Sequence, residues 1–207
     1  ALNVGGTHNV LKLALKCGAK KAIFSSTSHV YGISPKYLPT DERHPLWSQD
    51  TYTVGKLLGE HLCQLYYDNH GLSYLTLRIY NGYGPGQSTG YFIPDMIKKA
   101  LTGRIDLKGA DITKDFVFIS DIASAFVKAV NSQYTGAINI GSGRETRLGY
   151  AASFIARAFG VPIVALAAEG AGATRMHCDP TKALKLLGWR PEVSFEEGLN
   201  RTIESWR

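Results

Sequence analysis

The sequence lacks most of the patterns that identify metal-binding, disulfide-bonded and membrane proteins. Its three cysteines, Cys17, Cys63 and Cys178, lie far apart and form no C-x-x-C pair, so we expect reduced thiols in a cytoplasmic protein rather than a disulfide framework. The histidines show no metal-ligand spacing, which predicts no metal site. No apolar run is long enough to span a bilayer, and no charged segment followed by an apolar one opens the chain, so no membrane partner is predicted.

Charge runs, low-complexity segments and internal repeats are also missing. The 23 Lys and Arg residues exceed the 17 Asp and Glu residues, giving a formal net charge of +6, but the basic residues are scattered. A nucleic-acid surface would usually cluster them, so no nucleic-acid partner is predicted. The modest positive excess suits an anionic small substrate and equally a solvated surface. At 207 residues the chain can bury the core of one domain, or of one domain with a small annex.

What the sequence does contain is an alternation of helical and strand patterns. Apolar residues at helical spacing predict helices near residues 2–16, 52–67, 92–101, 121–130, 148–159 and 180–187, and one from residue 195 onward. Short apolar runs predict strands at residues 22–26, 72–79, 115–119 and 137–140, with a glycine-rich turn at 81–86 and Asp121 as a helix cap. The alternation predicts an α/β fold with a largely parallel sheet, and the irregular middle and tail predict a smaller lobe on the substrate side.

The sharpest local signal is the pair Tyr52 and Lys56, which are four residues apart on a predicted helix. Residues at this spacing lie on one face, one turn apart. An ammonium beside a phenol favours the phenolate and lowers the pKa of the tyrosine from about 10. Such a pair can exchange a proton with a substrate hydroxyl, although the spacing alone also occurs by chance on many helices.

The context of the pair strengthens this interpretation. The predicted strand before it ends in Ser25-Ser26-Thr27-Ser28, which places hydroxyl groups at the carboxyl end of a strand, where open α/β sheets bind ligands. The stretch 25–32 (SSTSHVYG) followed by Tyr-x-x-x-Lys resembles the extended short-chain dehydrogenase/reductases, the NAD-dependent epimerase/dehydratase family. Similar matches run along nearly the whole chain, at residues 3–7, 9–11, 77–85, 114–121, 139–143 and 175–191.

The resemblance implies roles for particular side chains. Thr27 would orient a sugar hydroxyl and share in the proton relay, Tyr52 would be the acid/base, and Lys56 would hold the nicotinamide ribose and tune Tyr52. The cofactor-binding residues implied are Asn3, Ser25, Tyr52, Lys56 and Tyr80. The substrate-binding residues implied are Thr27, His29, Asn81, Lys114 and Arg175, the last three near the nucleotide diphosphate.

The resemblance also implies an architecture and an activity. Residues 1–80, with segments around 115–145, would form part of a Rossmann-like dinucleotide-binding domain, and residues 81–114 and 146–207 would form mainly a substrate-binding lobe. The implied function is that of an NAD- or NADP-dependent nucleotide-sugar epimerase or related oxidoreductase. The implied assembly is a homodimer through the helices at 2–16 and 52–68. Two alternatives stay open: a catalytically silent, self-associating module, and a dehydrogenase acting on an amino or hydroxy acid.

Several positions depart from the family's pattern. The Gly-rich βαβ segment with which the family begins does not precede Asn3, so we expect this chain alone not to hold a dinucleotide in the family's manner. Three explanations stay open: a fragment, a remainder that is unresolved or in another chain, or a truncated gene.

Ser28 and His29 stand where 4,6-dehydratases have an Asp-Glu pair, and decarboxylating relatives have Glu in place of His29, so neither reaction is favoured. His29 is itself either an acid/base group or part of the pocket lining. Lys114 replaces an arginine and lacks its planar fork.

Overall fold

The centre of the fold is a sheet of three parallel strands. The computed structural model describes residues 2–166 and 174–207. The strands lie in the order β1-β2-β7, where β1 is Lys21–Thr27, β2 is Ser73–Ile79 and β7 is Gly136–Ile140. The middle strand β2 is buried from residue 74 to residue 78, as expected for the central strand of a parallel sheet that is covered on both faces. The predicted α/β class with a largely parallel sheet is confirmed.

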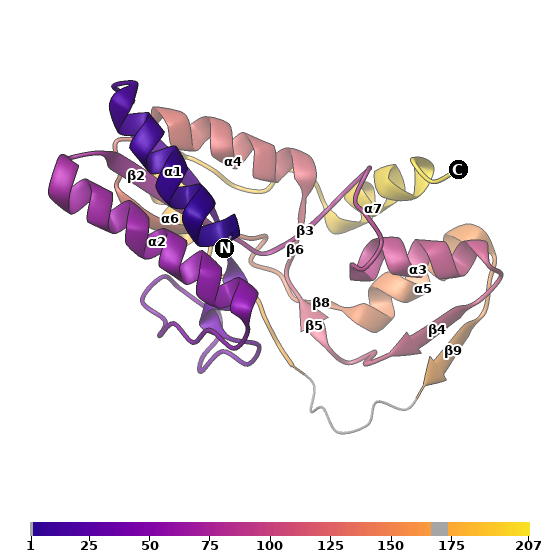
Figure 1. Cartoon of the computed structure of the whole chain (residues 1–207). Helices are drawn as coiled ribbons and strands as arrows, with labels where there is room; N and C mark the ends of the chain where they lie inside the picture. The colour runs from indigo at the N-terminus through magenta and orange to yellow at the C-terminus, as the bar shows by residue number, and fades with distance from the viewer. Residues whose placement is uncertain (1, 167–173) are drawn as a thin grey trace.

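Helices cover both faces of this sheet (Figure 1). On one face, α1 (Leu2–Lys16) and α2 (Thr51–His70) pack through Leu11 and Cys63 against Phe24 and Tyr74. On the other face, α4 (Ile119–Asn131) and α6 (Thr181–Leu187) join the core that contains Leu75 and Leu77. Successive residues of a strand point to opposite faces, so β2 supplies Tyr74 to one core and Leu75 to the other.

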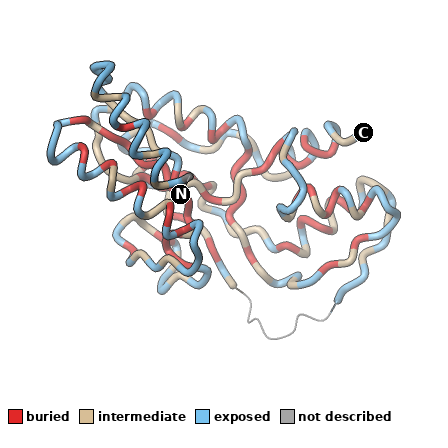
Figure 2. The backbone as a smooth tube through the Cα atoms, viewed as in Figure 1, coloured by how far each residue is buried: buried red, intermediate tan, exposed pale blue. Residues whose placement is uncertain are grey.

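A second body of helices and short strands adjoins the sheet, as Figures 1 and 2 show. Its helices are α3 (Phe92–Leu101), α5 (Leu148–Phe159) and α7 (Phe195–Glu204). Its strands pair two by two: β3 (Asn81–Tyr83) with β6 (Phe116–Phe118), β4 (Ile105–Lys108) with β9 (Ile163–Leu166), and β5 (Thr113–Lys114) with β8 (Thr146–Arg147). Ile97, Ile155 and Leu199 lie in its core. None of the helices in the described ranges is both long and apolar enough to cross a lipid bilayer.

The structure confirms the predicted helices and corrects three details. Helix α4 begins at Ile119, and Asp121 lies in its first turn rather than capping it. The Asp121 carboxylate accepts from Val193 N at 3.1 Å, and its carbonyl accepts from Trp189 Nε1 at 2.9 Å. The glycine-rich turn begins with β3, and the strand predicted at 115–119 is confined to β6. The other short strands have only two to four residues, too few to show a period of two.

The C-terminal tail is shared between the two bodies. Met176, Cys178 and Trp189 pack with the sheet, whereas Leu199 and Ile203 pack with the second body. The proposed assignment of 146–207 mainly to a substrate lobe stays a prediction.

Candidate active site

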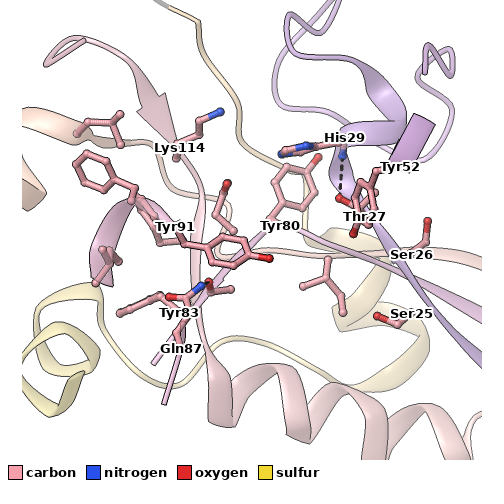
Figure 3. A pocket seen from close by; sticks show the side chains of 17 residues that line it. Ser25, Ser26, Thr27, His29, Tyr52, Tyr80, Tyr83, Gln87, Tyr91 and Lys114 are labelled. Carbon is pink, nitrogen blue, oxygen red and sulfur yellow. Dashed lines mark hydrogen bonds between the residues drawn. The ribbon is translucent and has the colours of Figure 1, made fainter. Parts of the chain in front are cut away.

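A cavity of about 550 Å³ lies at the edge where β1 and β2 end. Because these strands are parallel, with Thr27 paired to Ile79, the residues that follow both strands meet at that edge. Figure 3 shows side chains from β1, α2, β2 and the second body pointing into it. The predicted site residues in its wall are Ser25, Thr27, His29, Tyr52, Tyr80, Asn81 and Lys114.

A turn of 3₁₀ helix, η1 (Ser28–Tyr31), positions His29 beside Thr27. Thr27 ends β1 and caps this turn, since its Oγ1 accepts a hydrogen bond from His29 N at 3.2 Å. Ser28, Val30 and Tyr31 are buried, so His29 is the residue of the turn that is left partly exposed, and its ring lies in the cavity wall. Local chain geometry therefore fixes Thr27 and His29 together.

The start of α2 places Tyr52 in the same wall. Asp50 begins the helix with a capping box, in which Thr53 N donates to Asp50 Oδ1 at 2.7 Å and Asp50 N donates to Thr53 Oγ1 at 3.3 Å. Farther along, Gly59 lets the helix approach β1 closely, because a Cβ there would lie 2.4 Å from the Phe24 ring. The cap and this contact set where the half-exposed Tyr52 side chain (48%) meets the cavity.

Lys56 lies near Tyr52 as predicted, but the predicted lowering of the Tyr52 pKa is wrong for this chain. The Lys56 ammonium is 5.7 Å from the centroid of the Tyr52 ring and donates to Ser25 O at 2.9 Å. Burial raises the pKa of Tyr52, while a side-chain hydrogen bond from Thr27 opposes the rise. Burial also lowers the pKa of Lys56. Thr27, rather than Lys56, is thus the group that favours the phenolate.

Lys114 and His29 bring basic groups into the cavity. Burial lowers the pKa of the Lys114 ammonium. Burial is also the largest cause that lowers the pKa of His29, followed by the positive charge of Lys114, while the carboxylate of Asp50 raises it. Asn81 is held close by, since its Nδ2 donates to Asp115 O at 3.0 Å.

Two predicted residues lie outside this wall. Asn3 lines a separate hollow between the starts of α1 and α2, which shares Tyr52 with the main cavity. Arg175 is exposed and paired with Glu145, with 2.8 Å between Nη2 and Oε1. The roles suggested for both stay predictions.

An aromatic and apolar part of the wall was not predicted from the sequence. It comes from the second body and includes Tyr83, Tyr91, Phe92, Ile93, Phe116 and Leu148, with the polar Gln87 among them. Tyr83 and Phe116 pack edge to face, with centroids 5.9 Å apart. These residues come from three separate stretches of the sequence, 83–93, Phe116 and Leu148, so no local pattern could have grouped them.

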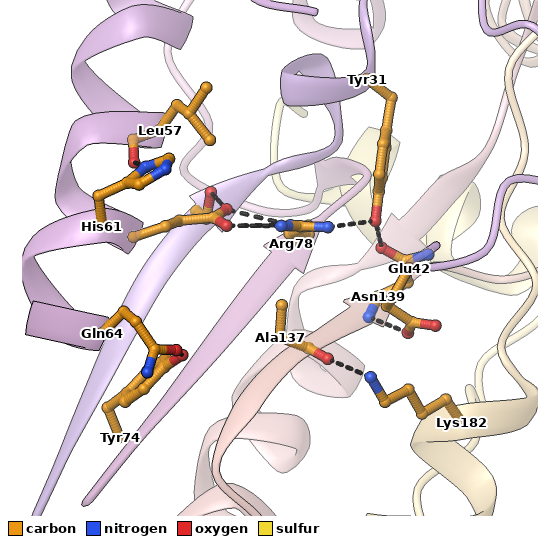
Figure 4. Close-up of polar contacts among 12 residues, drawn as sticks. Tyr31, Glu42, Leu57, His61, Gln64, Tyr74, Arg78, Ala137, Asn139 and Lys182 are labelled. Carbon is orange, nitrogen blue, oxygen red and sulfur yellow. Dashed lines mark hydrogen bonds and ion pairs between the residues drawn. The ribbon is translucent and has the colours of Figure 1, made fainter. Parts of the chain in front are cut away.

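A buried polar network behind the wall was also missed (Figure 4). Ser26, which lines the cavity, donates to Glu60 at 2.5 Å, and Glu60 pairs with Arg78 at 2.7 Å. Arg78 donates to the Tyr31 hydroxyl at 2.9 Å, and that hydroxyl donates to Asn139 Oδ1 at 2.7 Å. Arg78 as the single charged residue of a buried strand was the available signal, since a buried charge needs a partner.

Comparisons with known proteins agree with this geometry. The family model of the NAD dependent epimerase/dehydratase family matches residues 1–141. A putative UDP-glucose 4-epimerase of Methanocaldococcus jannaschii is 34% identical, with 98% of this chain and 68% of the relative covered. UDP-glucuronic acid decarboxylase 1 of Xenopus tropicalis is 32% identical, with 99% of this chain and 51% of the relative covered.

The fold agrees as well. The crystal structure of UDP-glucose 4-epimerase from Thermotoga maritima with UDP-glucose has a TM-score of 0.92 at 30% identity, covering 99% of this chain and 69% of that one. The sheet and its flanking helices are therefore Rossmann-like. The chain belongs to the NAD-dependent epimerase/dehydratase family.

Proposed function

We propose that the protein is a nucleotide-sugar epimerase or a related oxidoreductase, with Tyr52 as its acid/base. The observation that carries this proposal is that Tyr52 and Thr27, from separate elements, meet in one cavity with Lys56 beside them. Tyr52 exchanges a proton with a ring hydroxyl of the sugar, and Thr27 orients that hydroxyl and supports the phenolate through its hydrogen bond. NAD or NADP, when bound, supplies hydride exchange at the same carbon.

The side chains present suit the nicotinamide and ribose end of the cofactor. An ammonium has three N–H donors, and Lys56 directs one to Ser25 O, so the others are available for ribose hydroxyls. The exposed Ser25 and the buried Tyr80 lie in the cavity wall, and Asn3 lines the hollow on the other side of Tyr52. The 207 residues contain no Gly-rich βαβ segment for the pyrophosphate, so these contacts concern the nicotinamide end alone.

The substrate proposal rests on the rest of the wall. The Lys114 ammonium suits an anionic diphosphate, and Asn81 and His29 supply groups that can bind sugar or phosphate oxygens. The aromatic part of the wall suits the apolar faces of a sugar or a base. Arg175 is proposed as a further diphosphate ligand, which requires it to leave Glu145.

An epimerisation assay on a panel of nucleotide sugars, read by NMR, tests this function. Tyr52→Phe should lower the turnover rate by about 100-fold or more, the scale of a lost acid/base. Tyr150→Phe is the matched control, since Tyr150 is exposed and its hydroxyl bonds Glu196 away from the cavity. An unchanged rate in Tyr52→Phe would refute the proposal. Self-association without turnover of any sugar would favour the silent module instead.

We also propose a homodimer through α1 and α2. Both helices carry exposed apolar side chains, among them Val10, Leu13, Leu58 and Leu65. Burying such side chains between copies removes apolar surface from water. Leu13→Glu with Leu58→Glu should give a monomer in analytical ultracentrifugation. Val127→Glu, which changes an equally exposed apolar residue on α4, should leave the dimer intact.

A further inference from the structure

An acidic residue holds the arginine that is proposed to bind the substrate diphosphate. Glu145 lies in the turn between β7 and β8, and Arg175 lies in the C-terminal tail. Arg175 Nη2 is 2.8 Å from Glu145 Oε1, and Arg175 Nε donates to the two carboxylate oxygens at 3.0 and 3.2 Å. A planar guanidinium that meets a carboxylate through two nitrogens forms a directional, charge-assisted contact. The charge of Arg175 is therefore already paired within the chain.

This pairing leaves the guanidinium outside the main cavity. Lys114, the other cation proposed for the diphosphate, lies in the cavity wall, whereas Arg175 does not. The two backbones are nonetheless adjacent, because Thr113 N donates to Thr174 O at 3.0 Å. The residue before Arg175 is thus bonded to the residue before Lys114. A rotation of the long Arg175 side chain, without movement of the backbone, brings its charge toward an anion bound at Lys114.

The Glu145 carboxylate keeps a second neighbour when Arg175 leaves it. The Glu145 side chain is 22% exposed, and His177 Nδ1 lies 2.9 Å from the same Oε1 atom. Met176, between Arg175 and His177, is buried, which fixes the backbone that carries both side chains. The Arg175 side chain is 60% exposed. Arg175 is therefore the member of this cluster that can change partners, while Glu145 and His177 stay in place.

We propose that Glu145 is a positioning residue that holds Arg175 in a ligand-free arrangement, and that a nucleotide diphosphate takes the guanidinium from it. The proposal rests on the proposed function, in which Arg175 binds the diphosphate, and adds a competitor for that binding from within the chain. One anion replaces another at the same cation, and no covalent bond changes. The apparent affinity is then the intrinsic affinity multiplied by the fraction of molecules in which Arg175 has left Glu145.

A different role for the same pair predicts the opposite result. If Glu145 braced the guanidinium in its binding position, removal of the carboxylate would let Arg175 move and would weaken binding. If Glu145 competes with the ligand, its removal frees Arg175 and strengthens binding. Competition fits the structure, because the paired Arg175 lies outside the cavity wall. The sign of the change in affinity therefore decides between the two roles.

Calorimetric titration with uridine diphosphate measures this sign, at about 0.15 M salt, where exposed charges more than about 8 Å apart are largely screened. Exposed ion pairs are weak, so Glu145→Gln should bind about 2- to 5-fold more tightly than the unmodified protein. Arg175→Gln should bind more weakly, and adding Glu145→Gln to it should give no gain, since the gain acts through Arg175. Uridine, which has no phosphate, should bind all variants equally. Glu197→Gln, which removes a carboxylate paired with Arg201 on α7, is the matched control and should leave the affinity unchanged.

Glu145→Ala removes the carboxylate in a second way and should give the same gain, and thermal unfolding shows that each variant is folded. Tighter binding that disappears in the double variant supports the proposal. Unchanged or weaker binding by the two folded Glu145 variants, or a gain that persists without Arg175, overturns it and leaves the proposed function in place. Absence of binding by every variant overturns both. Tighter binding together with an unchanged turnover in Tyr52→Phe would overturn only the proposed acid/base role of Tyr52.

Discussion

Arg78 of β2 and Glu60 of α2 form an ion pair, 2.7 Å from Nη2 to Oε2, with side chains only 7% and 9% exposed. Ser26, in the cavity wall, donates to the same carboxylate. Glu60 follows Lys56 by one helical turn and Tyr52 by two. The pair therefore ties α2 to both β1 and β2 at a fixed position, and this position keeps Tyr52 opposite Thr27.

Removing the charge of Glu60 should destabilise the fold strongly. In Glu60→Gln the Arg78 guanidinium stays buried without a counter-ion, and breaking a buried pair in this way costs about 3 kcal/mol or more. Chemical denaturation should show the loss in the free energy of unfolding. Glu197→Gln is the matched control, since Glu197 pairs with Arg201 on the surface of α7, where such pairs contribute about 1 kcal/mol at most. Equal losses in the two variants would contradict the role of the buried pair.

Gly59 should tolerate no side chain, although glycine is usually unfavourable inside a helix. Gly59→Ala places a Cβ 2.4 Å from the Phe24 ring, and overpacking of this kind costs about 1–3 kcal/mol. Gly5→Ala in α1, where nothing lies within 4 Å of the new Cβ, should instead stabilise the folded protein by about 0.5–1 kcal/mol. If α2 is held against β1 at Gly59, thermal unfolding should show a lower melting temperature for Gly59→Ala and a higher one for Gly5→Ala. A melting temperature that rises in Gly59→Ala would contradict this close packing of α2 on β1.

The parts of the site that could be predicted from the sequence depend on local spacing. The hydroxyl run at the end of β1 and the Tyr52–Lys56 spacing each lie within one element, and a parallel sheet brings the carboxyl ends of its strands to one edge. Thr27, His29 and Tyr52 could therefore be expected at one edge, and the structure places them in one cavity wall.

The parts that could not be predicted depend on tertiary register. Glu60 contacts Arg78 because α2 crosses β2 at that point, and no local sequence pattern around either residue predicts the pair. The pKa of Tyr52 also depends on burial, which raises it and which the Lys56 spacing does not reveal. Tyr91 reaches the cavity only because α3 begins at its rim.

The three thiols should differ in reactivity. Cys17 is exposed, whereas Cys63 and Cys178 are buried. Burial raises the pKa of the Cys63 thiol to about 12 and raises that of Cys178 as well, so both stay protonated at pH 8, and the thiol is far less nucleophilic than the thiolate. An aromatic disulfide reagent should therefore modify only Cys17 in the folded protein and all three after denaturation. Rapid modification of Cys63 in the folded protein would contradict this packing.

Thr27 should control the ionisation of Tyr52. Its side-chain hydrogen bond lowers a pKa that burial raises, so Thr27→Val, which removes the hydroxyl and nearly keeps the shape, should raise the pKa of Tyr52 further. Thr27→Ser keeps a hydroxyl and should leave the pKa near that of the unmodified protein. NMR titration of ¹³C-labelled tyrosine measures the pKa of Tyr52, and the signal that disappears in Tyr52→Phe assigns the resonance. Since the hydrogen bond favours the phenolate, an unchanged or lower pKa in Thr27→Val would show that Thr27 does not support the base.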